Sequence, residues 1–466
     1  MTALIQVAYF VVAVLFILGL KAMASPVTAK RGIAWAGIGM VLATAITFAT
    51  PGMHNFVLMI VAIVLGGGLA WYLGRVVKMT DMPQMVAIYN GMGGGAAAAI
   101  AALEFSRGHV HGVVVTLLAV LGALIGSVAF SGSCVAFAKL QGIMKKAWRL
   151  PAQNAVNLML ALVALGLAIK LVMTGTASET GIASGALDTT TLIAFFIVSL
   201  ILGVVLTVPI GGADMPVVIS LLNAFTGLAV GLEGYVLGNP ALIIAGIVVG
   251  ASGTLLTQLM SKSMNRPITN IIFAPITGEA QAGEAITGTM KEASAMDAAA
   301  MMRFAQKVII VPGYGMAVAG AQHKVWEMAK LLQEAGVEVK FAIHPVAGRM
   351  PGHMNVLLAE AGVPYDMIFD LEEINEEFKQ ADVALVIGAN DVVNPSARTD
   401  KSSPIYGMPI LNVDYAQNVI VNKRGKGTGY SGIENSLFYG ENTRLLYGSA
   451  QQAIADVIAN IKTMQT

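Results

Sequence analysis

The feature that most constrains this chain is a series of long apolar stretches between residues 3 and 260. An apolar run of about 17–25 residues is long enough to cross a bilayer as a helix. Nine such runs cover approximately residues 3–20, 33–49, 54–73, 83–103, 110–130, 154–173, 189–209, 215–237 and 240–260. The sequence therefore predicts a multi-spanning α-helical membrane bundle of about nine helices, with the lipid bilayer as its surroundings.

The charged residues are divided unevenly along the chain. Residues 1–274 hold 13 of the 28 Lys and Arg and only 6 of the 27 Asp and Glu, and the remaining residues hold the rest. This change predicts a transmembrane domain over residues 1–274 and a water-soluble domain over residues 304–466. Between them, residues 275–303 are rich in Gly, Ala, Thr and Glu without apolar periodicity, which is typical of a linker, with a short helix expected over 294–305.

The loops between the apolar runs carry their positive charge on one side. Eleven Lys and Arg lie in loops of one side, whereas the other side holds Arg107, with Lys170 near a helix end. Positive loops face the cytoplasm. We therefore expect an external N-terminus and a cytoplasmic C-terminal domain.

Small residues inside the runs predict closely packed helices. Glycines gather at residues 66–68 and 91–95, and small side chains let helix backbones approach in lipid.

Three polar residues are expected at one depth of the bundle. Asn90, Asn223 and Ser252 each lie seven or eight residues from the cytoplasmic end of a predicted helix, which places them about 10–12 Å inside the membrane. Such side chains either hold water for a proton relay or only bond helices together, and both interpretations stay open.

Two carboxylates accompany the bundle. Asp214 directly precedes a helix and Pro216, so it is either a helix cap or a proton-entry and coupling group below Asn223. Glu233 lies in the outer turns of the same helix, as the far end of a path or as a surface charge.

From Lys307 onward, short apolar runs alternate with helical patterns. We expect strands at 308–311, 337–343, 365–369, 383–387, 410–413 and 418–421, and helices near 316–335, 354–361 and 372–379. This alternation predicts an α/β Rossmann-like parallel-sheet domain.

A glycine-rich turn follows the first of these strands. Gly313, Tyr314, Gly315 and Val318 give the spacing G-x-G-x-x-V between a strand and a helix. Glycines in this place allow a dinucleotide pyrophosphate to come close to the backbone, although an ordinary tight turn would also use them.

Two other segments of the sequence indicate whether the dinucleotide is NAD or NADP. The second strand runs into His344 and Pro345 without the carboxylate that usually binds the ribose of NAD. After the strand at 418–421, which we expect to be the last, comes a basic loop with Lys423, Arg424 and Tyr430, whose cations suit a 2′-phosphate. The sequence therefore favours NADP(H) as the cofactor.

Two further loops complete the expected binding rim. One spans residues 344–353 and contains Arg349, a candidate phosphate ligand; the other begins at Gly388 and contains Asn390 and Asp391, which can bond ribose or carboxamide groups. Neither a metal site nor a nucleic-acid partner is expected, and the lone Cys134 excludes a cysteine-based metal centre.

Together these residues resemble the beta subunit of proton-translocating NAD(P) transhydrogenase. The resemblance spans essentially the whole chain and rests on residues 213–218 with Asn223, on residues 312–318, on residues 344–358 and on residues 388–395. It implies an oxidoreductase and translocase of the bacterial inner membrane, Si/Re-specific, in a dimer of alpha–beta units. A separate alpha subunit would bind NAD(H), and hydride would pass from NADH to NADP⁺ as protons flow inward.

The resemblance also implies roles for individual residues. Gly313, Gly315 and Val318 would lie at the pyrophosphate, Lys423 and Arg424 at the 2′-phosphate, Tyr430 over the cofactor, and Arg349 and Asp391 along the site. Asp214, Asn223 and Ser252 would belong to the proton path.

Two positions depart from the family pattern. Gly425 stands where well-known members have Ser in the phosphate loop, and Asn90 stands where a relay histidine is common. Because asparagine does not titrate near neutral pH, a relay here needs water or a histidine elsewhere. Two alternatives remain: a transporter or channel regulated by a cytoplasmic nucleotide-sensing domain, and a membrane-anchored NADP-dependent reductase.

Overall fold

The computed structural model describes residues 2–107, 110, 112–144, 148–177, 189–212, 214–273, 289–350, 352–401, 403–425, 429 and 431–464. The chain divides into two compact units. The first comprises Met1–Pro209 and Ile219–Leu256, and the second Ile210–Val218 and Thr257–Thr466.

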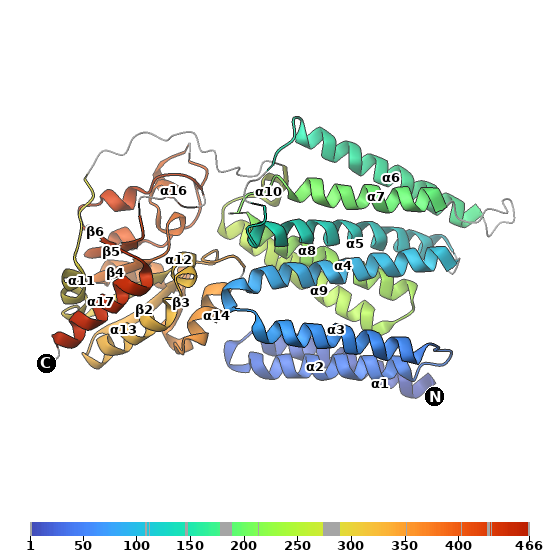
Figure 1. Ribbon diagram of the computed structural model, residues 1–466, viewed down its shortest axis with the longest axis horizontal. Helices are drawn as coiled ribbons and strands as arrows, with labels where there is room; N and C mark the ends of the chain where they lie inside the picture. Colours follow the sequence, from blue (N-terminus) through green and yellow to red (C-terminus); the bar gives the residue numbers. More distant parts are fainter. Residues whose placement is uncertain are drawn as a thin grey trace. The chain divides into compact units, whose positions relative to one another are not determined.

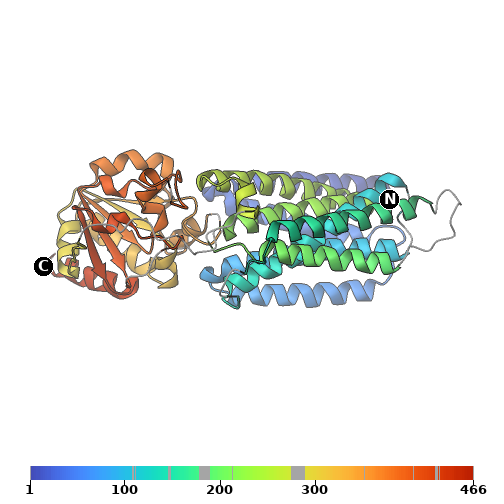
Figure 2. The same cartoon turned by 90° about the horizontal axis from the view of Figure 1, so that it is seen from above.

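The predicted membrane bundle is confirmed. Within the described residues, nine helices are long and apolar enough to cross a membrane. They lie side by side in both ribbon views (Figures 1 and 2). Their bounds are α1 Thr2–Met23, α2 Pro26–Phe48, α3 Phe56–Val76, α4 Met82–Arg107, α5 Val113–Leu140, α6 Gln153–Ala177, α7 Thr189–Thr207, α8 Met215–Val236 and α9 Pro240–Ser263.

Most of these helices are longer than the apolar runs suggested, and α2 and α5 differ the most. Helix α2 begins at Pro26, whose fixed φ suits the first helical position, so its first turns include the charged residues Lys30 and Arg31. Helix α5 continues ten residues past 130 because the polar residues Ser131 and Ser133 are buried inside the bundle.

Glycines bring pairs of these helices into backbone contact. On α4 and α5, a Cβ added to Gly94 would lie 2.9 Å from the carbonyl oxygen of Gly126. On α9, a Cβ added to Gly246 would overlap the backbone of Gly231 on α8. The predicted close packing therefore holds there, whereas Gly66 and its two neighbours on α3 have no described atom within 4 Å of such a Cβ.

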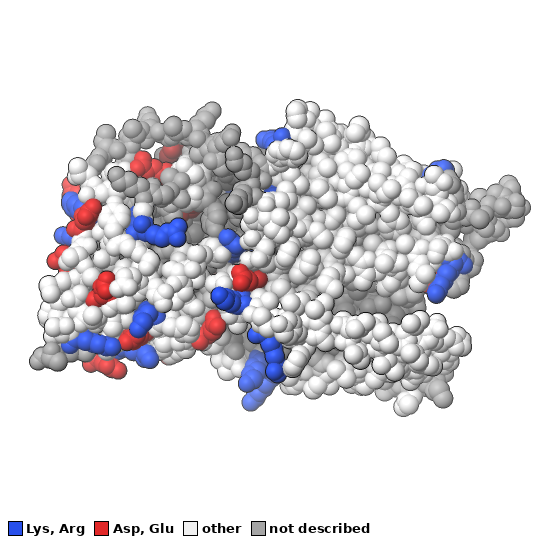
Figure 3. Space-filling model, in the orientation of Figure 1, with Lys and Arg blue, Asp and Glu red and all other residues white. Residues whose placement is uncertain are grey.

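Charged side chains avoid the middle of the helices. On the visible face of the first unit, Lys, Arg, Asp and Glu lie only near the helix ends (Figure 3). Large apolar side chains such as Leu58, Val64 and Trp71 are exposed on α3, as expected of a surface that meets lipid.

The second unit contains the predicted Rossmann-like domain. Its six strands are all parallel and lie in the order β3-β2-β1-β4-β5-β6. Helices flank both faces of this sheet (Figure 2). The strands are β1 Lys307–Pro312, β2 Glu338–Ile343, β3 Ile368–Asp370, β4 Val383–Ile387, β5 Asn418–Lys423 and β6 Thr443–Tyr447.

Helices and 3₁₀ turns complete the second unit. The α-helices are α10 Ile268–Phe273, α11 Ala295–Arg303, α12 Tyr314–Val318, α13 Gln322–Glu334, α14 His353–Glu360, α15 Leu371–Ile374, α16 Ser396–Thr399 and α17 Ala450–Thr463. The 3₁₀ helices in this unit are η2 Tyr365–Met367, η3 Asn375–Gln380, η4 Asp391–Val393, η5 Val413–Tyr415 and η6 Ser436–Tyr439. The short helix expected over 294–305 is α11, which packs against α17.

Three expectations about these elements were wrong. Residues 410–413 are not a strand, because the side chain of Asn375 binds the backbone carbonyl of Ile410 and the backbone amide of Asn412. The helix expected over 316–335 is split into α12 and α13 at Gly320, whose φ of +64° ends the first part. The basic loop follows β5, which is not the last strand, since β6 and α17 come after it.

The buried core of the sheet follows strand alternation. Ile309, Val311 and Val386 point to one face, where they pack against Phe378 and Phe438. Residues of opposite parity, such as Ile310, face the other side. This packing fixes the carboxyl ends of β1 and β4 side by side, where the strand order reverses.

Candidate functional site

Two glycine turns meet at the carboxyl ends of β1 and β4. The amide of Gly313 donates to the carbonyl of Ile387 at 2.8 Å, and the amide of Gly315 donates to the carbonyl of Gly388 at 2.9 Å. In an open α/β sheet, the crevice at such a reversal of strand order is where ligands bind. The glycine motif of the sequence therefore lies at the expected edge of the sheet.

Gly388 shows why glycine is required here. Its φ is +68°, and an added Cβ would overlap the amide nitrogen of Met316. A Cβ on Gly315 would lie 2.7 Å from the Cα of Gly388. The glycines thus serve the contact between the two turns, and Val318 at the third motif position is 58% exposed.

An arginine and two rings form a second part of this edge. The guanidinium carbon of Arg349 lies 4.4 Å from the ring centroid of Tyr314. His353, at the start of α14, is buried, and its Nδ1 accepts the amide hydrogen of Arg349 at 3.2 Å. The loop after β2 thereby brings a cation to the glycine turn after β1.

The basic pair at the end of β5 supplies two more cations. The Lys423 ammonium lies 4.0 Å from the ring centroid of Phe438, and Arg424 is exposed. Burial lowers the pKa of Lys423 from its ordinary value, while nearby Glu434 opposes this change. Tyr430, expected to cover a cofactor, lies outside the described residues, so its placement stays a prediction.

The polar residues after β4 contact the segment that follows the basic loop. Both carboxylate oxygens of Asp391 accept hydrogen bonds from Ser431, and the amide of Asn435 donates to Asn390. Asn394 is fully buried and donates to the carbonyl of Glu434 at 3.2 Å. Sequence reasoning missed Ser431 and Asn435, because no motif or spacing distinguishes them.

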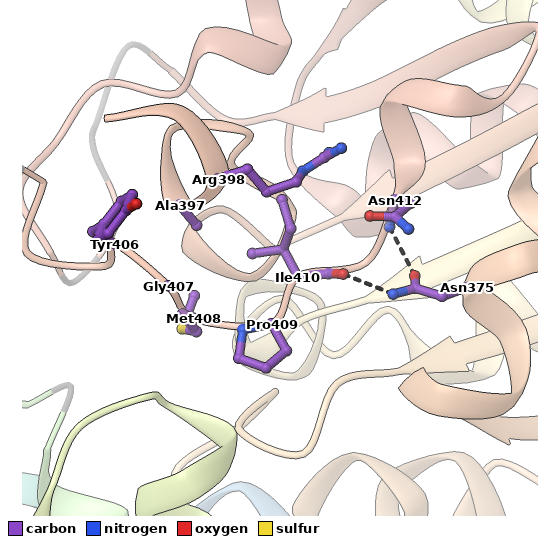
Figure 4. Close-up of a pocket in the computed structure, with 9 residues that line it drawn as sticks. All are labelled: Asn375, Ala397, Arg398, Tyr406, Gly407, Met408, Pro409, Ile410 and Asn412. Atoms are coloured by element: carbon purple, nitrogen blue, oxygen red, sulfur yellow. Dashed lines mark hydrogen bonds between the residues drawn. The ribbon is translucent and has the colours of Figure 1, made fainter. Parts of the chain in front are cut away.

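An open pocket of about 420 Å³ lies elsewhere in this domain. Asn375 pins its wall by donating to the carbonyl of Ile410 and accepting from the amide of Asn412, both at 2.9 Å (Figure 4). Buried His344 contributes as well, with Nε2 placed 2.7 Å from the carbonyl oxygen of Pro409. None of the residues proposed from the sequence lines this pocket: its lining is Asn375, Ala397, Arg398, Tyr406, Gly407, Met408, Pro409, Ile410 and Asn412.

Asp214 has a cationic partner that the sequence did not reveal. Its carboxylate is fully buried just before α8, and the Arg266 guanidinium lies 3.2 Å away, after the end of α9. The hydroxyl of Ser261 donates to the carbonyl of Arg266 and helps to hold this turn. Asp214 is therefore part of a buried ion pair.

Within the first unit, Asn90 lies in a small polar cluster. Its side-chain amide donates to the hydroxyl of Ser133 on α5 at 3.0 Å, and the hydroxyl of Thr226 on α8 donates to its carbonyl at 3.3 Å. The side-chain oxygen of Asn90 is buried and has no hydrogen-bond donor among the described residues. This arrangement links three helices and leaves an acceptor for a small polar ligand such as water.

The other two residues of the expected relay are placed differently. Asn223 is half-buried and makes no side-chain hydrogen bond to a described residue. The hydroxyl of Ser252 donates to the carbonyl of Val249 in its own helix. A role for either in proton transfer stays a prediction.

Glu233 is buried, and is not a surface charge. It is 1% exposed on α8, and neither carboxylate oxygen has a hydrogen-bond donor among the described residues. An added Cβ on Gly122 of α5 would overlap one of these oxygens, so a glycine leaves room for this side chain.

Taken together, a bundle of membrane-type helices and a parallel sheet with glycine turns at its reversal point define a membrane protein with a dinucleotide-binding type of domain. A family model described as "NAD(P) transhydrogenase beta subunit" matches residues 5–460. The chain therefore belongs to the NAD(P) transhydrogenase beta subunit family, as the sequence resemblance predicted.

Curated relatives agree with this assignment. The NAD(P) transhydrogenase subunit beta of Rhodospirillum rubrum is 45% identical over 470 residues, an alignment that covers 98% of each chain. The same subunit from a named strain of that species gives the same values.

Proposed function

We propose that this chain binds NADP(H) at the carboxyl edge of β1, β4 and β5. A partner alpha subunit holds NADH, and hydride passes from it to the bound NADP⁺. This transfer is coupled to inward proton movement. The observation that carries this proposal is the meeting of the two glycine turns at a sheet edge that also holds cations. Arg349 lies against Tyr314 of the first turn, and Lys423 and Arg424 stand at the carboxyl end of β5, the strand next to β4. Three cations suit the pyrophosphate and 2′-phosphate of NADP(H).

The donor set fits the cofactor without any further reactive group. NADP⁺ bound at this edge would supply the hydride acceptor, so the chain needs no nucleophile or acid–base residue for that step. Lys423 and Arg424 would hold the 2′-phosphate, while Gly313, Gly315 and Gly388 would let the backbone come close to the dinucleotide. The missing hydroxyl at Gly425 leaves these cations as the main source of NADP preference.

For the membrane part, we assign proton movement to the cluster of Asn90, Ser133 and Thr226, with Asn223 and Ser252 as further polar positions. The open acceptor on Asn90 supports a bound water there. Asp214, paired with Arg266, would couple the bundle to the nucleotide domain, and Asp391 would sense that change. Such coupling requires different NADP(H) affinities in the two states.

The assembly and topology are also proposals. We place the N-terminus outside and the second unit's sheet domain in the cytoplasm of a bacterial inner membrane, because the basic loops favour that side. A dimer of alpha–beta units with Si/Re-specific hydride transfer completes the proposed enzyme.

A reconstituted complex tests the whole proposal. The chain and its alpha partner are placed in liposomes, and NADH-dependent reduction of an NADP⁺ analogue is recorded together with the internal pH. We expect hydride transfer and a change of the internal pH to start together. An imposed opposing proton gradient should slow hydride transfer, and an uncoupler that dissipates this gradient should restore its rate. Hydride transfer without proton movement would contradict the coupling.

A matched pair of variants tests cofactor choice. Arg424→Gln should weaken NADP⁺ binding roughly ten- to hundredfold, because a hydrogen bond to a charged phosphate is lost, and should leave NAD⁺ binding unchanged. Arg444→Gln is the control, since Arg444 lies near the amino end of β6 and donates to Asn418. Equal effects of both variants, measured by calorimetry, would contradict the assignment of Arg424.

A further inference from the structure

The segment after the basic loop is hydrogen-bonded to the turn after β4. We call residues 431–437 the clasp segment. The amide of Ser431 donates to Oδ2 of Asp391 at 3.0 Å, and its hydroxyl donates to Oδ1 at 2.8 Å. One residue therefore engages both oxygens of one carboxylate.

Neighbouring residues support this contact. An added Cβ on Gly429 would overlap Oδ1 of Asp391 and lie 2.9 Å from the side-chain nitrogen of Asn390, so the chain can lie this close only with glycine there. The side chain of Asn435 donates to both the carbonyl and the side-chain oxygen of Asn390. Ser431 and Asn435 are each 1% exposed, so the contact is closed to solvent.

We propose that Ser431 is a positioning residue whose hydroxyl and amide clamp Asp391 and hold the clasp segment against the turn after β4. Resting on the proposed function, this clamp controls how fast NADP(H) leaves the site, because the clasp segment continues from the loop with Lys423 and Arg424. Asp391 then acts as an anchor for the segment.

The physical basis is a pair of charge-assisted hydrogen bonds. A carboxylate that accepts from both a hydroxyl and an amide in a buried place holds its partner more strongly than a neutral acceptor does. Removing only the hydroxyl leaves Oδ1 without that donor, while the backbone bond to Oδ2 can still form. The clamp should loosen in this variant without unfolding of the domain.

Amide hydrogen exchange of the full-length chain without nucleotide tests the clamp directly. Ser431→Ala should exchange about ten- to hundredfold faster across residues 431–437, as expected for one lost bond to a charged acceptor. Ser431→Thr, which keeps a hydroxyl, should restore slow exchange. Ser436→Ala is the matched control, because the Ser436 side chain has no hydrogen bond to a described residue. Unchanged exchange in Ser431→Ala would overturn the proposal.

A double-mutant cycle tests whether Ser431 acts through Asp391. NADP⁺ release is followed by stopped flow for Ser431→Ala, Asp391→Ala and the double variant. We expect Ser431→Ala to speed release about tenfold or more in the wild-type background and to add nothing when Asp391 is absent. An additive effect would overturn the clamp. If the wild-type chain does not bind NADP⁺, the proposed function is overturned, and the hydrogen-exchange experiment then tests the clamp independently.

Discussion

At the scale of single residues, the most demanding feature is the fully buried carboxylate of Asp214. A buried charge is tolerated when a partner of opposite charge and further hydrogen bonds replace its water. Arg266 supplies that partner from 52 residues away, at 3.2 Å. Removing either member leaves the other charge uncompensated, so the pair should behave as one unit.

Arg266→Gln should therefore destabilise the chain by about 3–5 kcal/mol, since it leaves a buried carboxylate without its cation. Asp214→Asn combined with Arg266→Gln should cost less than the sum of the two single changes. Thermal unfolding in detergent measures both effects. Lys262→Gln, an exposed lysine in the last turn of α9, is the control and should change little. Simple additivity would show that the two residues do not interact.

His344 gives the sheet domain a defined response to pH. Val346 donates to its Nδ1 at 3.1 Å, so the neutral ring carries its hydrogen on Nε2 and donates to the carbonyl of Pro409. Burial lowers the pKa of His344 to about 4, and the bond to Pro409 only partly opposes this change. Between about pH 4 and its ordinary value of 6.5, the unfolded chain therefore binds a proton that the folded chain does not.

The contribution of His344 to the free energy of unfolding should therefore be fully present above about pH 6.5. It should be lost, by roughly 3 kcal/mol, as the pH drops from about 6.5 toward 4. His344→Gln, which cannot titrate, should remove this part of the pH dependence. His323→Gln replaces an exposed histidine on α13 and should keep the wild-type profile. The measurement is the midpoint of thermal unfolding against pH, and parallel profiles for wild type and His344→Gln would refute the assignment.

At the scale of elements, periodicity predicted most of the structure because it depends on neighbours along the chain. The nine apolar runs became helices, and β1 to β5 were expected within a few residues. The segment 410–413 was misjudged because the backbone of Ile410 and Asn412 is held by Asn375, and that of the preceding Pro409 by His344, and both side chains lie far away in the sequence. Contacts of this kind also explain why Ser133, Thr226 and Ser431 were not anticipated: hydroxyl residues are common, and only the fold brings them to a site.

The close contact of α8 and α9 leads to an element-scale prediction. Gly246→Ala should destabilise the bundle by about 1–3 kcal/mol, because the added methyl group would overlap the Gly231 backbone and force the helices apart. Gly66→Ala on α3 meets open space among the described residues and should be neutral or slightly stabilising. Thermal unfolding of the isolated chain in detergent compares the two. A larger loss from Gly66→Ala would contradict the packing of α8 against α9.

At the scale of the whole molecule, the proposed function joins two kinds of site that can be disturbed separately. The polar cluster of Asn90, Ser133 and Thr226 belongs to the helical bundle, whereas the glycine turns and the basic pair belong to the sheet domain. A change in the cluster should therefore alter proton-coupled turnover while nucleotide binding stays intact. This separation distinguishes a coupled enzyme from a reductase that is only anchored in the membrane.

Ser133→Ala makes that separation measurable. It removes the acceptor of the Asn90 side-chain amide, so Asn90 should lose its fixed orientation, and NADH-dependent reduction of an NADP⁺ analogue in liposomes should slow by about tenfold or more. NADP⁺ affinity, measured by calorimetry on the same sample, should remain that of the wild type. Ser131→Ala is the matched control on the same helix, because its hydroxyl donates only to carbonyls of α5. Equal slowing by both variants, or a matching loss of NADP⁺ affinity, would show that the Asn90 cluster has no role in coupling. Its hydrogen bonds would then only link the helices.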